Sequence, residues 1–166
     1  MAGKKKGAVN SKKKTIDGIT FASGLEAYCY GKLKESGYDF TYEGKTFELL
    51  PGSKYEGVYY KSVPKSKAMQ SYQAKKVHPL KYTPDFFSSK HKFVIETKGF
   101  VPSQHTFPIR WKLFLHHLNE NGMGDYQLFL PRNQEQVNAV IQILNQSWLK
   151  NNCPIFTSKP HHEWLM

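Results

Sequence analysis

The sequence predicts an α/β fold in which a mixed central sheet is flanked by helices. Three stretches carry apolar residues at helical spacing, and the segments between them have the alternation and aromatic content typical of strands. Two of the strand-like stretches are joined by the short polar segment 88–91, as in a hairpin. The order is a helix, several strands that include this hairpin, a helix, a strand and a final helix, and it predicts helices packed on a mixed sheet.

The first helix begins at a capping box, Ser23-Gly24-Leu25-Glu26, and ends near Gly37. The second spans about Pro108–Asn119, and the third about Gln134–Leu149. Each has one apolar stripe that is expected to face the core. The stripes are Leu25, Tyr28, Cys29 and Leu33; Trp111, Phe114, Leu115 and Leu118; and Val137, Val140, Ile141, Leu144 and Trp148.

Strands are predicted between these helices. The least regular interval is 64–79, which favours either a short helix or an ordered loop. The expected strands are Asp39–Leu50 around a turn at Gly44, Tyr55–Val63, Lys81–Phe87, Lys92–Lys98 and Tyr126–Leu130.

A length of 166 residues suits one domain, predicted over residues 21–166, preceded by a flexible basic arm over residues 1–20. The basic N-terminus leads into no apolar region of a signal peptide, and no apolar run is long enough to cross a membrane. Cys29 and Cys153 form no CxxC pair. We therefore expect a cytoplasmic protein with reduced thiols and no membrane partner.

Positive charge is segregated along the chain. The formal net charge is +11, residues 1–14 hold six lysines and no acid, and residues 57–84 also contain no acid. Such clustering is typical of a protein that binds a polyphosphate such as DNA, although a solubilising surface or a basic membrane-bound tail would share it. The basic residues expected to contact DNA are Lys12, Lys13, Lys14, Lys75, Lys76, Lys81, Arg110 and Lys112. For the last two, a solvated helix face is the alternative.

The most specific pattern is Pro84-Asp85, followed after ten intervening residues by Glu96-Thr97-Lys98. Residues two apart on a strand project from the same face, so Glu96 and Lys98 should lie side by side. The preceding strand of the hairpin would bring Asp85 to the same edge of the sheet. Two carboxylates suit Mg²⁺, which takes oxygen ligands and retains water, and a nearby lysine can stabilise charge developing on a phosphate.

A simple surface ion pair is the alternative interpretation, because Glu-x-Lys arises often by chance. Proline within a strand is normally confined to edges and bulges, so Pro84 beside Asp85 favours a locally irregular functional edge.

These motifs resemble those of the PD-(D/E)xK nuclease superfamily. More closely, Ser-Gly-Leu-Glu, Tyr-Thr-Pro-Asp-Phe and Glu-Thr-Lys-Gly are similar to the phage endodeoxyribonuclease I type of Holliday junction resolvase. The resemblance covers residues 21–100 by motif. It implies a restriction-endonuclease-like αβββαβ core and a metal-dependent endodeoxyribonuclease, using Mg²⁺ or, in substitution, Mn²⁺.

Residue by residue, the resemblance implies that Asp85 and Glu96 bind the metal and that Lys98 is the catalytic lysine. It also implies that Glu26 reaches the site as a further metal or water ligand, and that Thr97 contributes its backbone carbonyl. Glu26 has a second interpretation, since it is the third helical residue of the capping box with Ser23.

Branched or distorted duplex DNA is the substrate that this resemblance favours, and two coordinated nicks on a junction would require a homodimer. Two alternatives stay open. One is a sequence-specific endonuclease of restriction or repair type, and the other is a DNA-binding accessory protein on the same fold that does not cut.

Overall fold

A computed structural model of the chain describes residues 13–98 and 106–152. Several features named above lie outside this part of the chain: Lys12 with most of the basic N-terminus, Gly99 at the end of the Glu-Thr-Lys-Gly motif, and Cys153.

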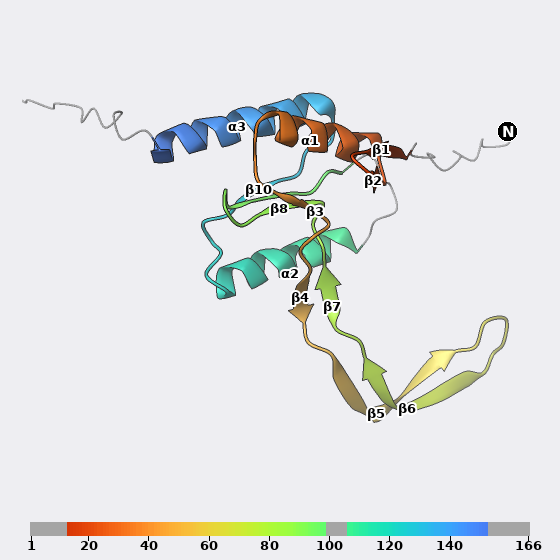
Figure 1. The fold of residues 1–166 in the computed structure, drawn as a ribbon. Coiled ribbons are helices and arrows are strands. Elements are labelled where there is room, and N and C mark those ends of the chain that lie inside the picture. The colour runs from red at the N-terminus through yellow and green to blue at the C-terminus, as the bar shows by residue number, and fades with distance from the viewer. Residues whose placement is uncertain (1–12, 99–105, 153–166) are drawn as a thin grey trace, which may run out of the picture.

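The centre of the molecule is a four-stranded mixed sheet with strand order β10-β9-β8-β3 (Figure 1). Its strands are β3 (Thr41–Tyr42), β8 (Phe86–Ser88), β9 (Phe93–Ile95) and β10 (Gln127–Phe129). The first three form an antiparallel meander, and β10 joins parallel to β9. The predicted hairpin is therefore confirmed, with Phe86 opposite Ile95 and Ser88 opposite Phe93.

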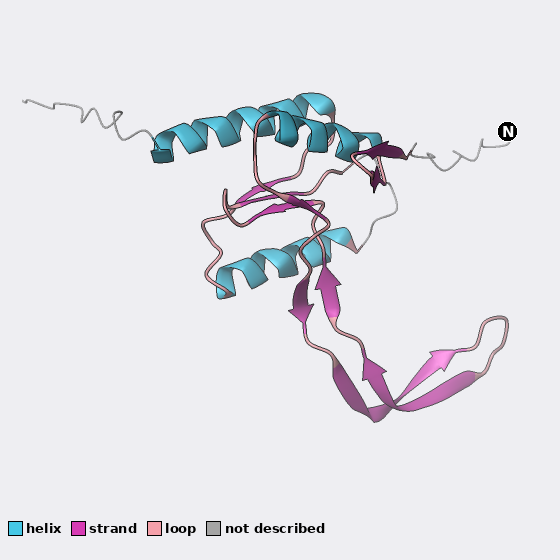
Figure 2. Ribbon diagram, viewed as in Figure 1, coloured by secondary structure: helices cyan, strands magenta, loops and turns pink. Residues whose placement is uncertain are grey.

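The three predicted helices are all present, as α1 (Gly24–Glu35), α2 (Phe107–Glu120) and α3 (Gln134–Asn152). Figures 1 and 2 show α1 and α3 on one face of the sheet and α2 on the other. α2 connects β9 to β10, as a parallel pair of strands requires. The fold is a mixed α/β structure, as the sequence predicted.

Each face of the sheet buries its own apolar cluster. On one side Phe86, Phe93 and Ile95 pack among residues of α1 and α3. On the other, Val94 packs with Phe47, Tyr82 and residues of α2. Most of the predicted helix stripes are buried here, whereas Leu115 and Trp148 are 40% and 50% exposed, because the buried stripe of each helix is narrower than the apolar pattern.

A long antiparallel hairpin is inserted between β3 and β8. Its base pairs β4 (Phe47–Leu50) with β7 (Leu80–Tyr82), and its outer part pairs β5 (Ser53–Ser62) with β6 (Met69–Val77). We call residues 53–77 the arm, and Figure 1 shows it extending away from the core. The prediction of a short helix or ordered loop for 64–79 was wrong, since most of this interval is strand β6 and pairs with β5.

The predicted strand Lys81–Phe87 is interrupted at Thr83-Pro84-Asp85, which separates β7 from β8. The stretch Asp39–Leu50 is interrupted at the same level, between β3 and β4, where the sequence predicted a turn at Gly44. The two breaks lie opposite each other, because the Glu43 N–H donates to the Asp85 carbonyl at 2.8 Å and the Thr46 and Thr83 hydroxyls are 2.7 Å apart. This irregular zone is where the candidate site lies.

The prediction that residues 1–20 form a flexible basic segment is wrong for the last residues of that segment. Residues 14–21 form a small hairpin of β1 (Lys14–Ile16) and β2 (Ile19–Phe21). Asp17 and Gly18 turn the chain with φ values of 52° and 77°, the left-handed conformations that a tight hairpin needs. The tight turn and the burial of Phe21 order this segment. In the described part of the chain, no helix is long and apolar enough to span a bilayer.

Candidate active site

Asp85 lies at the strand break, with its carboxylate held by the neighbouring strand. Oδ2 accepts two hydrogen bonds from Thr97, from the backbone N–H at 2.7 Å and from the hydroxyl at 2.6 Å. Its other oxygen, Oδ1, accepts no hydrogen bond from the described part of the chain. The carboxylate is therefore fixed through Oδ2.

Glu96 is 4% exposed and lies next to Asp85. The backbone N–H of Asp85 donates to Glu96 Oε2 at 3.2 Å, and the Tyr82 hydroxyl donates to the same oxygen at 2.8 Å. Glu96 Oε1 forms an ion pair with Lys98 Nζ at 2.5 Å, which confirms that these two side chains lie together. Glu96 and Lys98 extend the pairing of β9 with β10, since their N–H groups donate to the carbonyls of Phe129 and Pro131.

The surroundings of Asp85 raise the pKa of its carboxyl group. Burial raises the pKa of Asp85 to about 7, the charge of Glu96 adds to this rise, and the hydrogen bonds from Thr97 oppose it. Glu26 on α1 contributes a further, smaller rise. Asp85 in turn adds to the raised pKa of Cys29, whose main cause is burial. These effects place Asp85 at the meeting point of β8, β9 and α1.

Glu26 is 8% exposed, and the structure shows the helix-capping role that the sequence left open. It completes the capping box, because Ser23 Oγ accepts from the Glu26 N–H at 3.2 Å and donates to Glu26 Oε1 at 2.7 Å. Glu26 Oε2 accepts from the Ala22 N–H and from the Tyr42 hydroxyl, at 3.0 and 2.6 Å. The carboxylate is thus engaged by its own helix terminus while its charge still reaches Asp85.

Sequence reasoning missed the two tyrosines that hold the carboxylates. Tyr82 donates to Glu96 and Tyr42 donates to Glu26. Burial and the neighbouring carboxylates raise the pKa of both hydroxyls, so each remains a proton donor across the physiological range. The tyrosines are 14 and 16 residues from their partners, and only the break in the β-strands brings these positions together. The aromatic-Thr-Pro-Asp context of Tyr82 was the one available signal.

The donor set suits a hard divalent cation with an incomplete coordination shell. Asp85 and Glu96 supply adjacent carboxylate oxygens, the kind of ligand that Mg²⁺ takes. Within residues 13–98 and 106–152, however, no three His, Cys, Asp or Glu side chains converge closely enough to hold an ion by themselves. The predicted trio of Glu26, Asp85 and Glu96 therefore does not meet at one point, and a bound ion would take further ligands from water and substrate.

Comparison with known proteins assigns the chain to a family. Residues 6–127 match the family model described as protein of unknown function, DUF1064. The chain belongs to the DUF1064 family. No curated protein and no solved structure matches the chain. The stretch matched to DUF1064 contains Glu26, Asp85, Glu96 and Lys98, and it also contains the whole arm.

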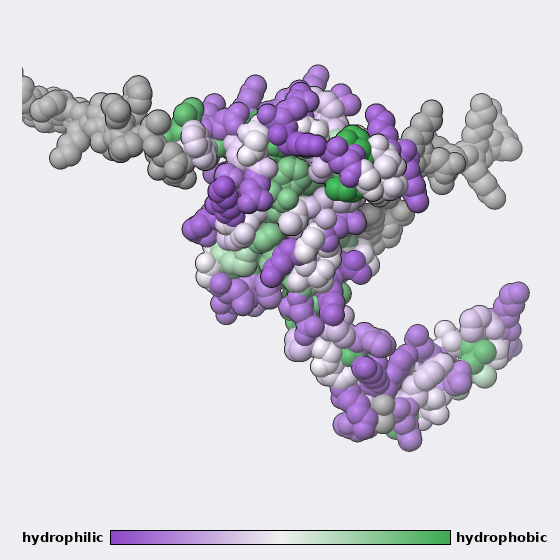
Figure 3. Space-filling model, viewed as in Figure 1, coloured by the Kyte–Doolittle hydropathy of each residue, from purple (hydrophilic) through white to green (hydrophobic). Residues whose placement is uncertain are grey.

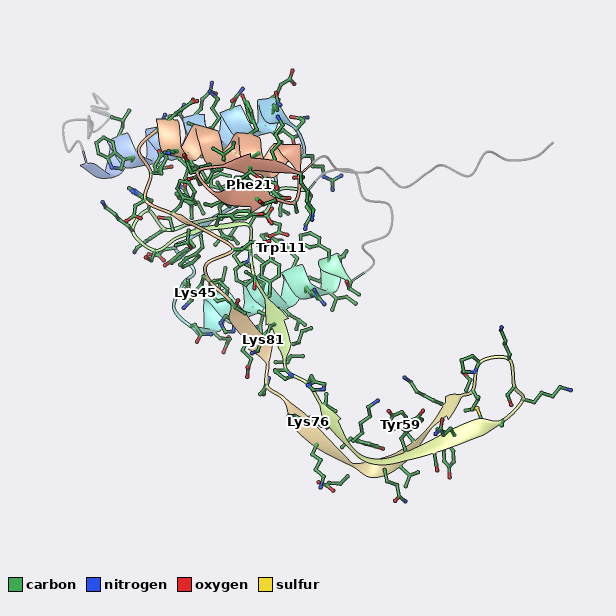
Figure 4. All side chains as sticks on the ribbon, turned by 45° about the vertical axis from the view of Figure 1, so that its right-hand side comes forward. Phe21, Lys45, Tyr59, Lys76, Lys81 and Trp111 are labelled. Atoms are coloured by element: carbon green, nitrogen blue, oxygen red, sulfur yellow. The ribbon has the colours of Figure 1, made fainter. Side chains whose placement is uncertain are left out.

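The basic residues predicted to contact DNA fall in three places on this family member. Lys13 and Lys14 are exposed at the N-terminal hairpin, and Arg110 and Lys112 are exposed on α2. The remaining three lie along the inserted hairpin, Lys81 on β7 and Lys75 and Lys76 on β6. Figure 4 shows Lys81 at the base of the inserted hairpin, close to the core, and Lys76 further along it, at the inner end of the arm where it lies opposite Lys54. The arm therefore links the candidate site to an extended basic surface.

Proposed function

We propose that this protein is a metal-dependent endodeoxyribonuclease that hydrolyses phosphodiester bonds of DNA, with branched or distorted duplex as its preferred substrate. The observation that carries the proposal is the pairing of Asp85 with Glu96 at a broken strand, with Lys98 held at 2.5 Å from Glu96. The shared environment of the carboxylates, which raises the pKa of Asp85, favours a bound cation that would relieve their repulsion.

The architecture supports the same proposal. An antiparallel meander of β3, β8 and β9, followed by α2 and a parallel β10, has the αβββαβ order of a restriction-endonuclease-like core once α1 is included. We propose that the fold is of this type, with the arm inserted between its first two strands.

Each site residue has a distinct part in this proposal. Asp85 and Glu96 bind Mg²⁺, or Mn²⁺ in substitution, and the Thr97 N–H and hydroxyl fix the orientation of Asp85. Tyr82 holds Glu96 from the opposite side. When bound, the ion activates a water and offsets charge on the phosphate.

Lys98 is placed to stabilise charge at the reacting phosphate. Its Nζ lies 4.5 Å from the centre of the Phe107 ring, and the side chain is 23% exposed. A cation that is partly shielded from water interacts more strongly with an anion than one in bulk solvent.

The test is cutting of a four-way junction and a linear duplex of matching sequence, in Mg²⁺ or EDTA. The wild type should cut the junction in Mg²⁺, and Asp85→Asn should lose at least about 10³-fold in rate while still binding DNA. Asp39→Asn is the matched control, because it removes an exposed carboxylate outside the site.

Equal cutting of junction and duplex would support a nuclease of broader or sequence-read choice, and a discrete fragment pattern would identify the sequence-specific type. An unchanged rate in Asp85→Asn would remove Asp85 from the mechanism. Failure of the wild type to cut with either metal, with tight binding retained, would favour the accessory protein.

A further inference from the structure

The arm is a two-stranded ribbon that the core does not cover. β5 and β6 pair along their whole length, from Ser53 opposite Val77 to Ser62 opposite Met69. Among the residues of these strands whose exposure is described, none is buried, and only Gly57, Tyr59 and Tyr72 are partly shielded from solvent. An isolated two-stranded hairpin is marginal in water. A ribbon this long and this exposed therefore points to a partner that covers it.

The charge of the arm indicates the chemistry of that partner. Residues 53–77 contain six lysines and one acid, Glu56, a formal net charge of +5. Glu56 pairs with Lys54 at 3.2 Å, so it neutralises the lysine nearest the base. The other lysines form no salt bridge with the described part of the chain. These are Lys61, Lys65, Lys67, Lys75 and Lys76. Figure 3 shows hydrophilic residues along most of the arm's length.

One cluster on the arm combines aromatic rings with a lysine. Tyr59 and Tyr72 face each other across the strands, with ring centres 5.2 Å apart and nearly parallel planes. The ring centre of Tyr55 lies 6.2 Å from that of Tyr59. Lys75 Nζ lies 5.8 and 5.4 Å from the centres of the Tyr59 and Tyr72 rings. The cluster holds its tyrosines on the arm itself, far from the buried core (Figure 4). The rings stiffen the ribbon and present an ammonium group beside apolar surface, a combination suited to sugar-phosphate.

The shape of the arm fits duplex DNA. A two-stranded ribbon has the width that the major groove admits. The ten residues of β5 span about 33 Å, close to one helical turn of B-DNA. A register shift between Tyr55 and Val58 inserts an extra residue into β5, and such a bulge bends the strand that carries it. Figure 1 shows the bend between the base and the tip of the arm.

We propose that the arm lies in the major groove of duplex DNA next to the site of cutting, with its lysines on the phosphates. The proposal rests on the proposed function for its account of what the arm is joined to, because β4 and β7 connect the arm directly to the break that carries Asp85. A second copy of this chain is the competing occupant, since neither edge of the ribbon pairs with another strand in the described part of the chain. Lysines along exposed strands oppose edge-to-edge pairing, which favours DNA.

The test measures DNA binding separately from cutting. In the Asp85→Asn background, the combined variant Lys61→Gln, Lys65→Gln, Lys67→Gln and Lys76→Gln is titrated against a fluorescein-labelled linear duplex by anisotropy. The matched control removes four core lysines, as Lys32→Gln, Lys34→Gln, Lys90→Gln and Lys92→Gln. Both variants lower the formal charge equally, and circular dichroism confirms that both remain folded.

We expect the arm variant to bind at least about tenfold more weakly. The slope of the logarithm of the binding constant against the logarithm of salt concentration is negative. In the arm variant it should become less negative by about 3.6, which is about 0.9 for each phosphate that the variant no longer neutralises. The core control should change affinity less than about threefold. Equal weakening in both variants would show a general charge effect, and an unchanged slope in the arm variant would show that the arm does not hold phosphates. Either result overturns the proposal.

A second variant removes the arm as a unit, replacing residues 53–77 with a short turn between β4 and β7. Weakened duplex binding by a protein whose mass in solution is unchanged supports the DNA-binding arm. Conversion of a dimer to a monomer with duplex affinity retained overturns it in favour of a second copy. Absence of cutting by the wild type would count against the proposed function alone, because these titrations do not depend on cutting.

Discussion

The candidate site and the arm are connected through β4 and β7 but have opposite surroundings. At the site, Glu96 is 4% exposed and each carboxylate is held by hydrogen bonds from named donors. On the arm, Tyr60 is 64% exposed and the lysines extend into solvent. Shielding from water strengthens electrostatic interactions at the site. The exposed charges of the arm are accessible to a large partner, but salt screens them. This contrast fits the two proposals together: the buried site would carry out the chemistry and the exposed arm would bind the DNA.

The difference between the core around the site and the arm should be largest in how much a substitution lowers the free energy of unfolding. Phe86 is fully buried between the sheet and α1, so Phe86→Ala should lower the free energy of unfolding by about 3–5 kcal/mol. Tyr60→Ala, on the arm, should change it by less than about 0.5 kcal/mol. Urea unfolding followed by circular dichroism measures both. A similar destabilisation in both variants would mean that the arm packs against the core in solution.

The hydrogen bond from Tyr82 to Glu96 should have an intermediate effect. Tyr82→Phe leaves a buried carboxylate oxygen with one donor fewer, which should cost about 1–3 kcal/mol of stability and slow cutting less than Asp85→Asn does. Tyr60→Phe is the control, because its hydroxyl is on an exposed side chain. If Tyr82→Phe melted at the wild-type temperature, the hydrogen bond would contribute nothing to holding Glu96.

The two roles of Glu26 can be separated by comparing two substitutions. Ser23→Ala removes the N-cap of α1 and should cost about 1 kcal/mol of stability while leaving the cutting rate unchanged. Glu26→Gln should slow cutting at least about tenfold, because it removes the charge near Asp85. Thermal melts and single-turnover rates are measured on both variants. A Glu26→Gln variant that is less stable but cuts at the wild-type rate would leave Glu26 as a helix cap alone.

The smallest effect concerns pH and a histidine remote from both regions. Burial, with the charge of Lys90 adding to it and Asp39 opposing it, lowers the pKa of His91 below its ordinary value of 6.5. Tyr38 and Phe93 flank the ring, and Nε2 has no hydrogen-bond partner in the described part of the chain. The unfolded chain therefore takes up the proton first as the pH falls, and the stability contributed by neutral His91 is lost below about pH 6.5.

Melting temperatures of the wild type and His91→Phe between about pH 7.5 and 5.5 measure this contribution. The wild type should lose more stability over this window than the variant. Parallel curves for the two proteins would remove His91 as the cause.

Sequence patterns predicted the core well because its elements bury one face each. The stripe of α3 repeats at helical spacing since one side of the helix packs on the sheet, and Val137, Val140, Ile141 and Leu144 are indeed buried. The arm left no such pattern. Both faces of β6 meet solvent, so period-two alternation is absent, and its strand structure depends on pairing with β5 rather than on local propensity.

Some contacts of the candidate site could likewise be predicted from the sequence, and others could not. Glu96 and Lys98 are two apart, so their ion pair followed from strand geometry. The donors Tyr82 and Tyr42 could not be assigned, because the breaks at residues 43–46 and 83–85 change which side chains meet. Pro84 signalled that a break would occur, but not which partners it would bring to Glu26 and Glu96.

The most direct test of the separation is the single-turnover rate of junction cutting, measured against protein concentration in Mg²⁺. The wild type, Asp85→Asn and the four-lysine arm variant with Asp85 intact are compared on the same DNA. We predict that the arm variant reaches the wild-type maximum rate at a higher protein concentration, whereas Asp85→Asn stays slow at every concentration. An arm variant with a reduced maximum rate and unchanged half-saturation would contradict the separation. A wild type that never cuts would contradict the nuclease itself.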